Sequence, residues 1–324
     1  MAILNWREYT NHPDIGMTTT SVFQSFAVET SRGPMTVRSM LSAFELALLY
    51  ALAKDWYTGA GEIVDGGPLL GLSTYALAHG LAVNARPVST RRRIYSFDLF
   101  LARDMGWHVE GSDSGTGSVL DRFLEINREY LDSISISAGD LLDMRWDGKP
   151  IEVLFIDVAK TWDLNAWTLR NWYPALIPER SMVVHQDYVY FNQYWLALTM
   201  AWLSEYFDRC EEVFGATVCF LNRSPIPAEK LNTDLAAFPL FEKVRLMEQA
   251  MRASSPSARE VLKCGLAYCM LEHGEIQEAH NILDSVRPVA GPDRETDFSE
   301  IAASNVRIVS ELIERGRVQP AEAR

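Results

Sequence analysis

Short apolar runs that alternate with helical patterns constrain the fold of this chain more than any other feature. Five runs lie at residues 63–64, 93–98, 133–137, 151–157 and 182–185. The run at 151–157 is almost continuously apolar, as expected of a strand that is buried on both faces of a parallel sheet. Helical patterns follow at residues 72–82, 118–131 and 164–173. This order predicts a doubly wound α/β fold with a parallel sheet.

The sheet is predicted to continue beyond the fifth run. Residues 192–207 have the pattern of a long aromatic helix, and residues 212–221, interrupted by Gly215, have that of an antiparallel pair that closes the sheet. Residues 104–117, rich in Gly, Ser and Asp, predict a loop. The complete prediction is a Rossmann-like, seven-stranded, mostly parallel sheet with an α-helical C-terminal extension.

Changes of pattern along the chain divide it into three regions. Residues 1–35 have little periodicity and predict an irregular N-terminal arm, while residues 36–224 form the α/β domain, which opens with a helix over residues 36–54. Residues 225–324 contain four helical patterns, at 239–252, 256–271, 276–286 and 298–315. The middle two resemble one tetratricopeptide-type hairpin, and a plain helical cap is the alternative.

Charge and composition exclude several classes of protein. The formal net charge is −13, which argues against a nucleic-acid partner because phosphates are usually met by a basic surface. The dense basic cluster at residues 91–93 is interpreted as solvated surface. The four cysteines form no C-x-x-C pair, so neither a zinc site nor a disulfide framework is predicted. The absence of a signal-peptide core and of a run long enough for a bilayer predicts a cytoplasmic protein without a membrane partner.

Carboxylates follow four of the predicted strands. Asp65, Asp98, Asp140 and Asp157 end them, and Asp187 comes just after the fifth. Each could alone be a helix cap or a loop acid. Because ligands of open parallel sheets bind at the carboxyl ends of the strands, the coincidence predicts that these acids share one site.

A glycine turn joins the first strand to its helix. Residues 61–81 follow the order strand, turn, helix, and Gly67 and Gly71 would let backbone N–H groups approach a ligand. The glycines are spaced G-G-x-x-x-G and do not match the G-x-G-x-x-G of dinucleotide-binding proteins. A pyrophosphate ligand is therefore disfavoured, and with it an NAD-dependent oxidoreductase.

This turn resembles the first motif of class I S-adenosylmethionine-dependent methyltransferases, which ends an apolar strand with an acid and continues as G-x-x-x-G-x-S-T. The residues that match are Asp65, Gly67, Gly71, Ser73 and Thr74. The resemblance implies S-adenosylmethionine as cofactor and S-adenosylhomocysteine as product. It places Asp65 and Gly67 near the methionine portion, with backbone groups making most of the contacts.

The same resemblance assigns roles at the next two strand ends. Asp98, in the string YSFDLF, would accept both ribose hydroxyls, and Leu99 would flank the adenine. Asp140 and Leu141, in the string ISAGDLL, would lie at the adenine amino group.

Residues 155–188 resemble macrocin-type small-molecule O-methyltransferases, which match at Asp157, Asp187 and Tyr188. Magnesium-binding relatives carry further acids where this chain has Ala159 and Gln186. Because a hard cation needs several oxygen ligands, the chain is predicted to lack a metal site, and Mg²⁺ dependence is the alternative.

Four residues are candidates for the catalytic step. Methyl transfer to a hydroxyl needs a base, and His185 is the best-placed histidine, beside Asp187 and across from Asp157. A core-edge histidine is the alternative. Lys160 would orient an anionic substrate or pair with Asp157. The aromatic residues from Tyr188 to Trp195 would form a wall for the acceptor, or else a core or the surface of a homo-oligomer.

Taken together, the residues and the resemblance predict an S-adenosylmethionine-dependent methyltransferase. Its partner would be a small-molecule acceptor, such as a sugar or another secondary metabolite, methylated on oxygen. The alternative is a methyltransferase-like binding or scaffold subunit without turnover, which the lost acids at positions 159 and 186 motivate.

Overall fold

The computed structural model describes residues 5–10, 16–18, 24–30, 33–86, 94–101, 119–294 and 296–315. The predicted loop at 104–117 and the basic cluster at 91–93 lie outside these residues. The chain divides into two compact units, the first made of Met1–Val158 and Ala175–Val183, the second of Ala159–Pro174 and Val184–Arg324. The domain boundaries expected near residues 35 and 225 stay predictions.

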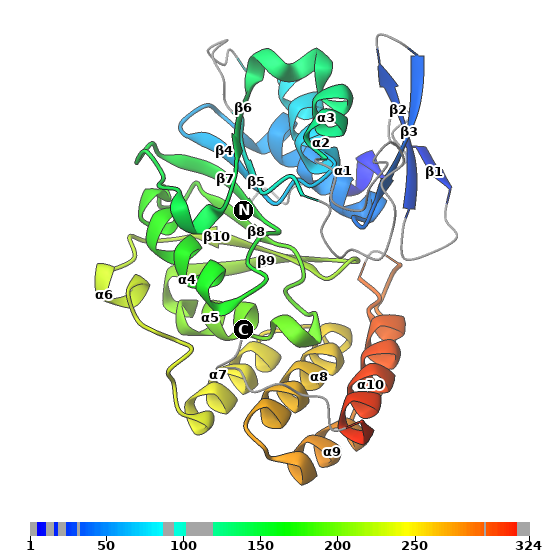
Figure 1. The fold of residues 1–324 in the computed structure, drawn as a ribbon, viewed down its shortest axis with the longest axis vertical. Coiled ribbons are helices and arrows are strands. Elements are labelled where there is room, and N and C mark those ends of the chain that lie inside the picture. Colours follow the sequence, from blue (N-terminus) through cyan, green and yellow to red (C-terminus); the bar gives the residue numbers. More distant parts are fainter. Residues whose placement is uncertain are drawn as a thin grey trace. The chain divides into compact units, whose positions relative to one another are not determined.

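The predicted sheet is confirmed. It has seven strands in the order β6-β5-β4-β7-β8-β10-β9 (Figure 1). β4 pairs in parallel with β5 and β7, β5 pairs in parallel with β6, and β9 and β10 form an antiparallel hairpin. The strand bounds are β4 Glu62–Gly66, β5 Ile94–Asp98, β6 Ile134–Ala138, β7 Ile151–Ile156, β8 Met182–His185, β9 Phe207–Val213 and β10 Thr217–Asn222. Every residue of β7 is buried, in agreement with its apolar sequence.

In the first unit, helix α1 begins at a side-chain cap that the sequence supplies. The side chain of Ser42 accepts a hydrogen bond from the Glu45 backbone N–H, and the Glu45 carboxylate accepts one from the Ser42 N–H, which is a capping box at the start of α1. The elements are the 3₁₀ helix η1 Trp6–Tyr9, α1 Ala43–Ala51, the π-helical turn η3 Leu52–Trp56, α2 Leu72–Ala82, α3 Leu120–Ile126, and the 3₁₀ helices η4 Arg128–Ser133 and η5 Leu141–Asp143.

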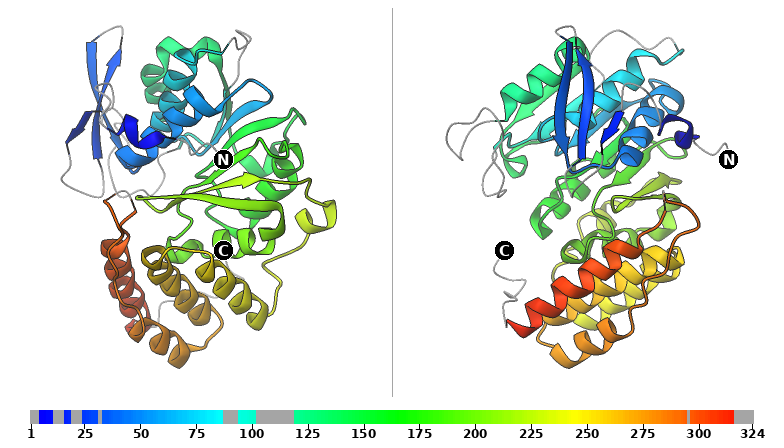
Figure 2. Two further views of the ribbon diagram at one scale, coloured as in Figure 1. Left: turned by 180° about the vertical axis from the view of Figure 1, so that it is seen from behind. Right: turned by 90° about the vertical axis from the view of Figure 1, so that its right-hand side faces the viewer.

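Two predictions near the N-terminus were wrong. The segment expected to be an irregular arm contains strands of a three-stranded antiparallel sheet, β1 Gly16–Thr18, β2 Gln24–Thr30 and β3 Gly33–Ser39 (Figure 2). β3 also replaces the start of the helix expected over residues 36–54. The apolar spacing counted Val37 and Met40 on one helical face, but Val37 is buried opposite Phe26 of β2, whereas Met40 is 47% exposed.

A buried acid at the second position of β7 fixes the loop before β4. The carboxylate of Glu152, fully buried, accepts hydrogen bonds from the backbone N–H and hydroxyl of Thr58, at 2.8 and 2.7 Å, and from the N–H of Ala60, at 2.8 Å. These donors satisfy a charge that would otherwise be costly to bury. Gly61 is also required here, because a Cβ would lie 2.7 Å from the Glu152 nitrogen.

The second unit is mainly helical, and the four C-terminal helices are confirmed close to their predicted bounds. α8 begins at the cap Ser255 with Pro256 in its first turn, and it packs against α7, α9 and α10. The elements are α4 Trp162–Asn171, η6 Tyr173–Ala175, η7 Phe191–Gln193, α5 Trp195–Trp202, η8 Ser204–Tyr206, α6 Ala228–Leu231, α7 Leu240–Arg252, α8 Pro256–Glu272, α9 Ile276–Asp284 and α10 Ser299–Glu314. None of the helices in the described ranges is both long and apolar enough to cross a bilayer.

Candidate active site

The carboxyl ends of β4, β5, β6 and β7 lie along one edge of the sheet. In the parallel registers, Asp65 pairs with Ser96 of β5 and with Phe155 of β7, and Asp98 pairs with Ala138 of β6. Asp157, which is half-buried, follows β7 and donates its N–H to Gly66 at 2.7 Å. Burial raises the pKa of Asp65, and the nearby Asp157 and Asp98 carboxylates add smaller contributions in the same direction. Asp65, Asp98 and Asp157 therefore lie along one edge of the sheet, and the expectation that the five acids share one site stays a prediction.

Asp98 is held in place by two backbone groups. Its Oδ2 accepts the N–H of Leu69 at 2.8 Å, and its Oδ1 accepts the N–H of Phe100 at 2.7 Å. Both donors have left-handed backbones, with φ of +50° and +51°, a conformation that is costly for such side chains and is concentrated at functional sites. Burial raises the pKa of Asp98, against the effect of these hydrogen bonds.

The anchored carboxylate keeps room for a ligand. Each oxygen has two lone pairs, and the backbone bonds to Leu69 and Phe100 occupy one on each, with a further, smaller contribution from the N–H of Leu99. Asp98 is only partly buried, so the other lone pairs suit the two adjacent hydroxyls of a ribose. Sequence reasoning missed Leu69 and Phe100, because a positive φ on a bulky residue leaves no signal in composition.

Apolar side chains next to Asp98 present surface for a flat ring. Leu99 is 53% exposed, and Gly139, at the end of β6, donates its N–H to the Asp98 carbonyl at 2.9 Å. Asp140 caps η5 by accepting the Leu142 N–H at 2.9 Å. Leu141, predicted to lie at the adenine amino group, is only 4% exposed, whereas Leu142 is 41% exposed. The side chain of Leu141 therefore belongs to the core and that of Leu142 faces outward, and the role of Leu141 at the cofactor stays a prediction.

Asp65 is closed off from solvent. Its carboxylate, fully buried, accepts the hydroxyls of Ser73 and Thr74 at 2.9 and 2.5 Å, and its Oδ1 has no partner among the described residues. Burial raises the pKa of Asp65 to about 7. The side chains of Asp65 and Ser73 thus fix the start of α2, and ligand contacts in this turn would come from the backbone.

The predicted glycines are required by packing inside the turn. Gly67 has φ of +93°, and a Cβ there would lie 2.8 Å from the backbone of Asp157. Gly71 has φ of +95°, and a Cβ would collide with Asn127, whose side chain donates to the Gly71 carbonyl at 3.1 Å, and with Phe123. These contacts explain both glycines through packing, and ligand approach remains a further reason to be tested.

In the second unit, Asp187 is the centre of a polar cluster. Its Oδ2 accepts both the ammonium of Lys160 and the amide of Gln193, each at 2.7 Å. Lys160 also donates to the Gln186 side-chain oxygen at 3.3 Å. Asp187 has φ of +59° and lies two residues after β8. Lys160 thus pairs with Asp187, and Gln193 is a polar partner that the sequence analysis did not identify.

His185 was wrong as a catalytic base. Its ring is fully buried, and Nε2 is 2.7 Å from the hydroxyl of Tyr173. The rings of Tyr188 and Phe220 pack against it. Burial lowers the pKa of His185 to about 3, so the imidazole stays neutral without access to a substrate. The alternative, a core-edge histidine, is the one that the structure supports, although its partner is a tyrosine and not a carbonyl.

The expected aromatic wall is mostly core. Tyr188, Phe191, Tyr194 and Trp195 are each at most 4% exposed, and Tyr190 is half-buried. Trp195 Nε1 donates to the Ala159 carbonyl at 2.8 Å, and Ala159 directly precedes Lys160 of the polar cluster. The alternative, that these rings are core, agrees with their burial.

Metal ligands do not gather in this part of the protein. Among the described residues, no three His, Cys, Asp or Glu side chains are close enough to hold a metal ion. At the positions where acids would be needed, Ala159 is buried and Gln186 contacts the ammonium of Lys160.

Comparisons with known proteins identify similar folds only. No protein-family model matches the sequence, and no curated protein matches it. Solved structures that resemble it include apo CalS11, a TDP-rhamnose 3′-O-methyltransferase of calicheamicin biosynthesis, with 15% identity and a TM-score of 0.41 over 55% of this chain and 76% of that one. A second is the SAH-bound methyltransferase PaMTH1 of Podospora anserina, with 13% identity and a TM-score of 0.39 over 57% of this chain and 80% of that one. A third is a methyltransferase from Geobacter sulfurreducens, with 16% identity and a TM-score of 0.35 over 55% of this chain and 77% of that one. The Rossmann-like fold class itself follows from the strand order.

Proposed function

We propose that this chain is an S-adenosylmethionine-dependent methyltransferase that acts on a hydroxyl group of a small molecule. The observation that supports the proposal most directly is the carboxylate of Asp98. It lies at the carboxyl edge of a parallel sheet, anchored by two backbone donors and open on its remaining lone pairs. A carboxylate held in this way suits a vicinal diol.

The residues around Asp98 fit the remaining parts of the cofactor. The exposed side chains of Leu99 and Leu142 offer apolar surface for adenine, and Asp140 is exposed beside them. The carboxylate of Asp157, which follows β7 at the same edge and is half-buried, favours a cation nearby. When bound, S-adenosylmethionine supplies an electrophilic methyl group on a positively charged sulfur.

Asp187 replaces His185 as the proposed base for the acceptor. Its carboxylate is 20% exposed, and Lys160 and Gln193 both donate to the same oxygen, Oδ2. Oδ1 is therefore the proposed atom that takes the proton of the acceptor hydroxyl, while Lys160 and Gln193 hold the carboxylate in orientation. The same ammonium would favour a negatively charged acceptor, such as a sugar phosphate or a phenolate.

The test combines cofactor binding with methyl transfer. Wild-type protein should bind S-adenosylhomocysteine in a calorimeter and transfer label from S-adenosylmethionine to at least one member of a panel of hydroxylated sugars and phenols. Asp187→Asn should keep cofactor affinity and lower kcat by about 10²- to 10⁴-fold. Lys160→Met should lower kcat and raise KM for anionic acceptors.

A matched control comes from another lysine–aspartate pair. Lys149 and Asp147 are 2.7 Å apart, and the Lys149 side chain is 46% exposed against 43% for Lys160. This pair precedes β7 and so lies away from the carboxyl edge. Lys149→Met should leave transfer unchanged. Full activity in Asp187→Asn would refute its role as base, and the absence of cofactor binding in the wild type would refute the proposal as a whole.

The second candidate is a cofactor-binding protein without turnover. The observation that favours it is the burial of His185 together with Ala159 and Gln186 at the metal positions. Tight binding of S-adenosylhomocysteine without transfer to any acceptor, in the wild type, would select this candidate.

A further inference from the structure

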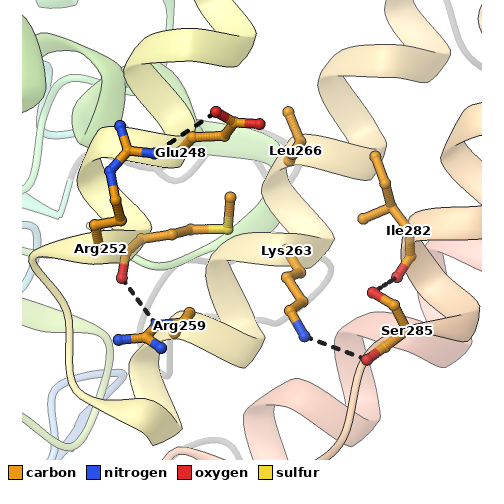
Figure 3. Close-up of a pocket in the computed structure, with 8 residues that line it drawn as sticks. Glu248, Arg252, Arg259, Lys263, Leu266, Ile282 and Ser285 are labelled. Carbon is orange, nitrogen blue, oxygen red and sulfur yellow. Dashed lines mark hydrogen bonds and ion pairs between the residues drawn. The ribbon is translucent and has the colours of Figure 1, made fainter.

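A pocket on the C-terminal helices lies within the second unit. It has a volume of about 400 Å³ and is formed by the end of α7, the first half of α8 and the end of α9 (Figure 3). The residues that line it are Glu248, Met251, Arg252, Arg259, Lys263, Leu266, Ile282 and Ser285. None of them belongs to the proposed active site.

The charge of this pocket is opposite to that of the chain. Three of its lining residues are cationic, Arg252, Arg259 and Lys263, against the single acid Glu248. The whole chain, in contrast, has 43 acidic and 30 basic residues. Because the chain as a whole is negatively charged, it does not attract anions over a long range. The pocket would therefore select an anionic ligand through local contacts with its cations.

The two arginines are available for an anion. Arg259 donates to the backbone carbonyls of Met251, at 3.0 Å, and Ser254, at 3.3 Å, and no carboxylate of the described chain forms an ion pair with it. The Arg252 side chain is 67% exposed, and its one ion pair among the described residues is with Glu248, at 3.7 Å, in an i,i+4 pair that is easily exchanged. Figure 3 shows the side chains of Arg252 and Arg259 on the same side of the pocket.

Lys263 has a different role from the arginines. Its ammonium bonds to the Glu260 carboxylate at 2.8 Å and to the Ser285 carbonyl at 3.2 Å, so its charge is balanced and it joins α8 to the end of α9. The pocket is thus braced on this side, and its uncompensated positive charge lies at Arg252 and Arg259.

Between these cations the pocket is apolar. Leu266 is 6% exposed, and Met251 and Ile282 are half-buried, so their side chains form a floor that can take up an apolar group. The combination requires a ligand with a carboxylate or another anion next to an apolar side chain. The open side of the pocket, where Arg252 stands in solvent, suits a chain segment that covers it better than a small molecule, which is usually enclosed.

We propose that this pocket is a docking site for an acidic peptide segment of a partner protein. Carboxylates of the segment would bond to Arg252 and Arg259, and an adjacent apolar side chain would pack on Met251, Leu266 and Ile282. The C-terminal helices would then recruit a partner independently of the methyltransferase reaction proposed above.

The test uses the full chain and an array of 12-residue peptides in which the positions of Glu, Asp, Leu and Phe are varied. Peptides with at least two acids next to an apolar residue should be retained, and their isosteres with Gln and Asn should not. For the best peptide, measured by fluorescence anisotropy, Arg252→Ala/Arg259→Ala should weaken binding by at least about tenfold. Ile282→Glu should weaken it as well, and it leaves the Arg259 bonds to α7 intact.

The control is Arg245→Ala, which removes an exposed arginine of α7 that pairs with Glu242 and does not line the pocket. Its peptide affinity should equal that of the wild type, and circular dichroism should show all variants folded. Three outcomes would overturn the proposal: no peptide retained, equal retention by the pocket variants and the wild type, or saturable binding of inorganic phosphate that excludes the peptide, which would make this a small-anion site.

Discussion

The anchored carboxylate of Asp98 gives the sharpest test of the proposed cofactor site. A ribose diol would donate two hydrogen bonds to the charged side chain, each worth about 1.5–3 kcal/mol when the acceptor is ionised. Asp98 is only partly buried, so water replaces part of this energy, and we expect Asp98→Ala to lose about 3 kcal/mol. At 1.4 kcal/mol per decade, this is a roughly 100-fold weaker affinity for S-adenosylhomocysteine.

Asp98→Ala should also lower stability, for a separate reason. The N–H groups of Leu69 and Phe100 lose their acceptor, at a cost of about 1 kcal/mol each where water can partly reach them. In Asp98→Asn the amide oxygen retains one backbone bond and one ribose bond. We therefore expect an intermediate loss of affinity, about tenfold.

Affinity is measured by calorimetry with S-adenosylhomocysteine, and stability by urea unfolding of the free protein. Asp147→Ala, which removes an exposed acid paired with Lys149, is the control and should change neither quantity by much. If Asp98→Ala unfolds more easily but binds with wild-type affinity, the carboxylate is a purely structural anchor and the placement of the ribose is refuted.

Three further predictions concern stability and acid–base behaviour. Burial raises the pKa of Asp65 from 3.8 to about 7, so between these pH values the folded state keeps a proton that the unfolded chain has released. The free energy of unfolding should therefore fall as pH rises from about 4 to 7, by up to about 4 kcal/mol. Urea titrations should show a smaller slope in Asp65→Asn. Burial lowers the pKa of His185 from 6.5 to about 3, so stability is lost as pH falls from 6.5 towards 3, by up to about 5 kcal/mol. His185→Gln should lessen this loss and leave the pH profile of kcat unchanged. An altered kcat profile would restore the histidine as base. Gly67→Ala should lower the free energy of unfolding by at least about 2 kcal/mol, because a Cβ would meet the neighbouring backbone at 2.8 Å. Gly148→Ala, with φ of +81° and open space around it, should lower it by only about 1 kcal/mol, for the strained backbone. Equal shifts of the two melting temperatures would contradict this reasoning.

The fold was largely predictable because its signals are local. Five of the six residues of β7 are apolar, and such a run predicts a strand that is buried on both faces. The C-terminal helices have clear periodicity, and α8 has a Ser-Pro start at residue 255. The N-terminal sheet was not predictable from local signals. β2 and β3 contain few apolar residues, and the pairing of Phe26 with Val37 depends on a register that no local pattern specifies.

The candidate site was predictable in outline and not in detail. Strand ends predicted the shared edge of Asp65 and Asp98, because topology alone brings them together. Side-chain exposure depends on tertiary packing, so the sequence could not distinguish Leu141 from Leu142, nor foresee that Tyr173 would enclose His185.

The buried Glu152 has a consequence for any attempt to divide this protein into pieces. The loop before β4 obtains its hydrogen-bond acceptor from a strand that is more than 90 residues away along the chain, through Thr58 and Ala60. A fragment that stops before residue 150 would leave the Thr58 hydroxyl and the backbone N–H groups of Thr58, Ala60 and Gly61 without their acceptor. It would also expose the surface that Gly61 presents to β7. In a split protein cut at this position, β4 should therefore become ordered only when the second fragment supplies the Glu152 carboxylate. A circular permutant opened at the same position should tolerate the cut, because both pieces stay in one chain.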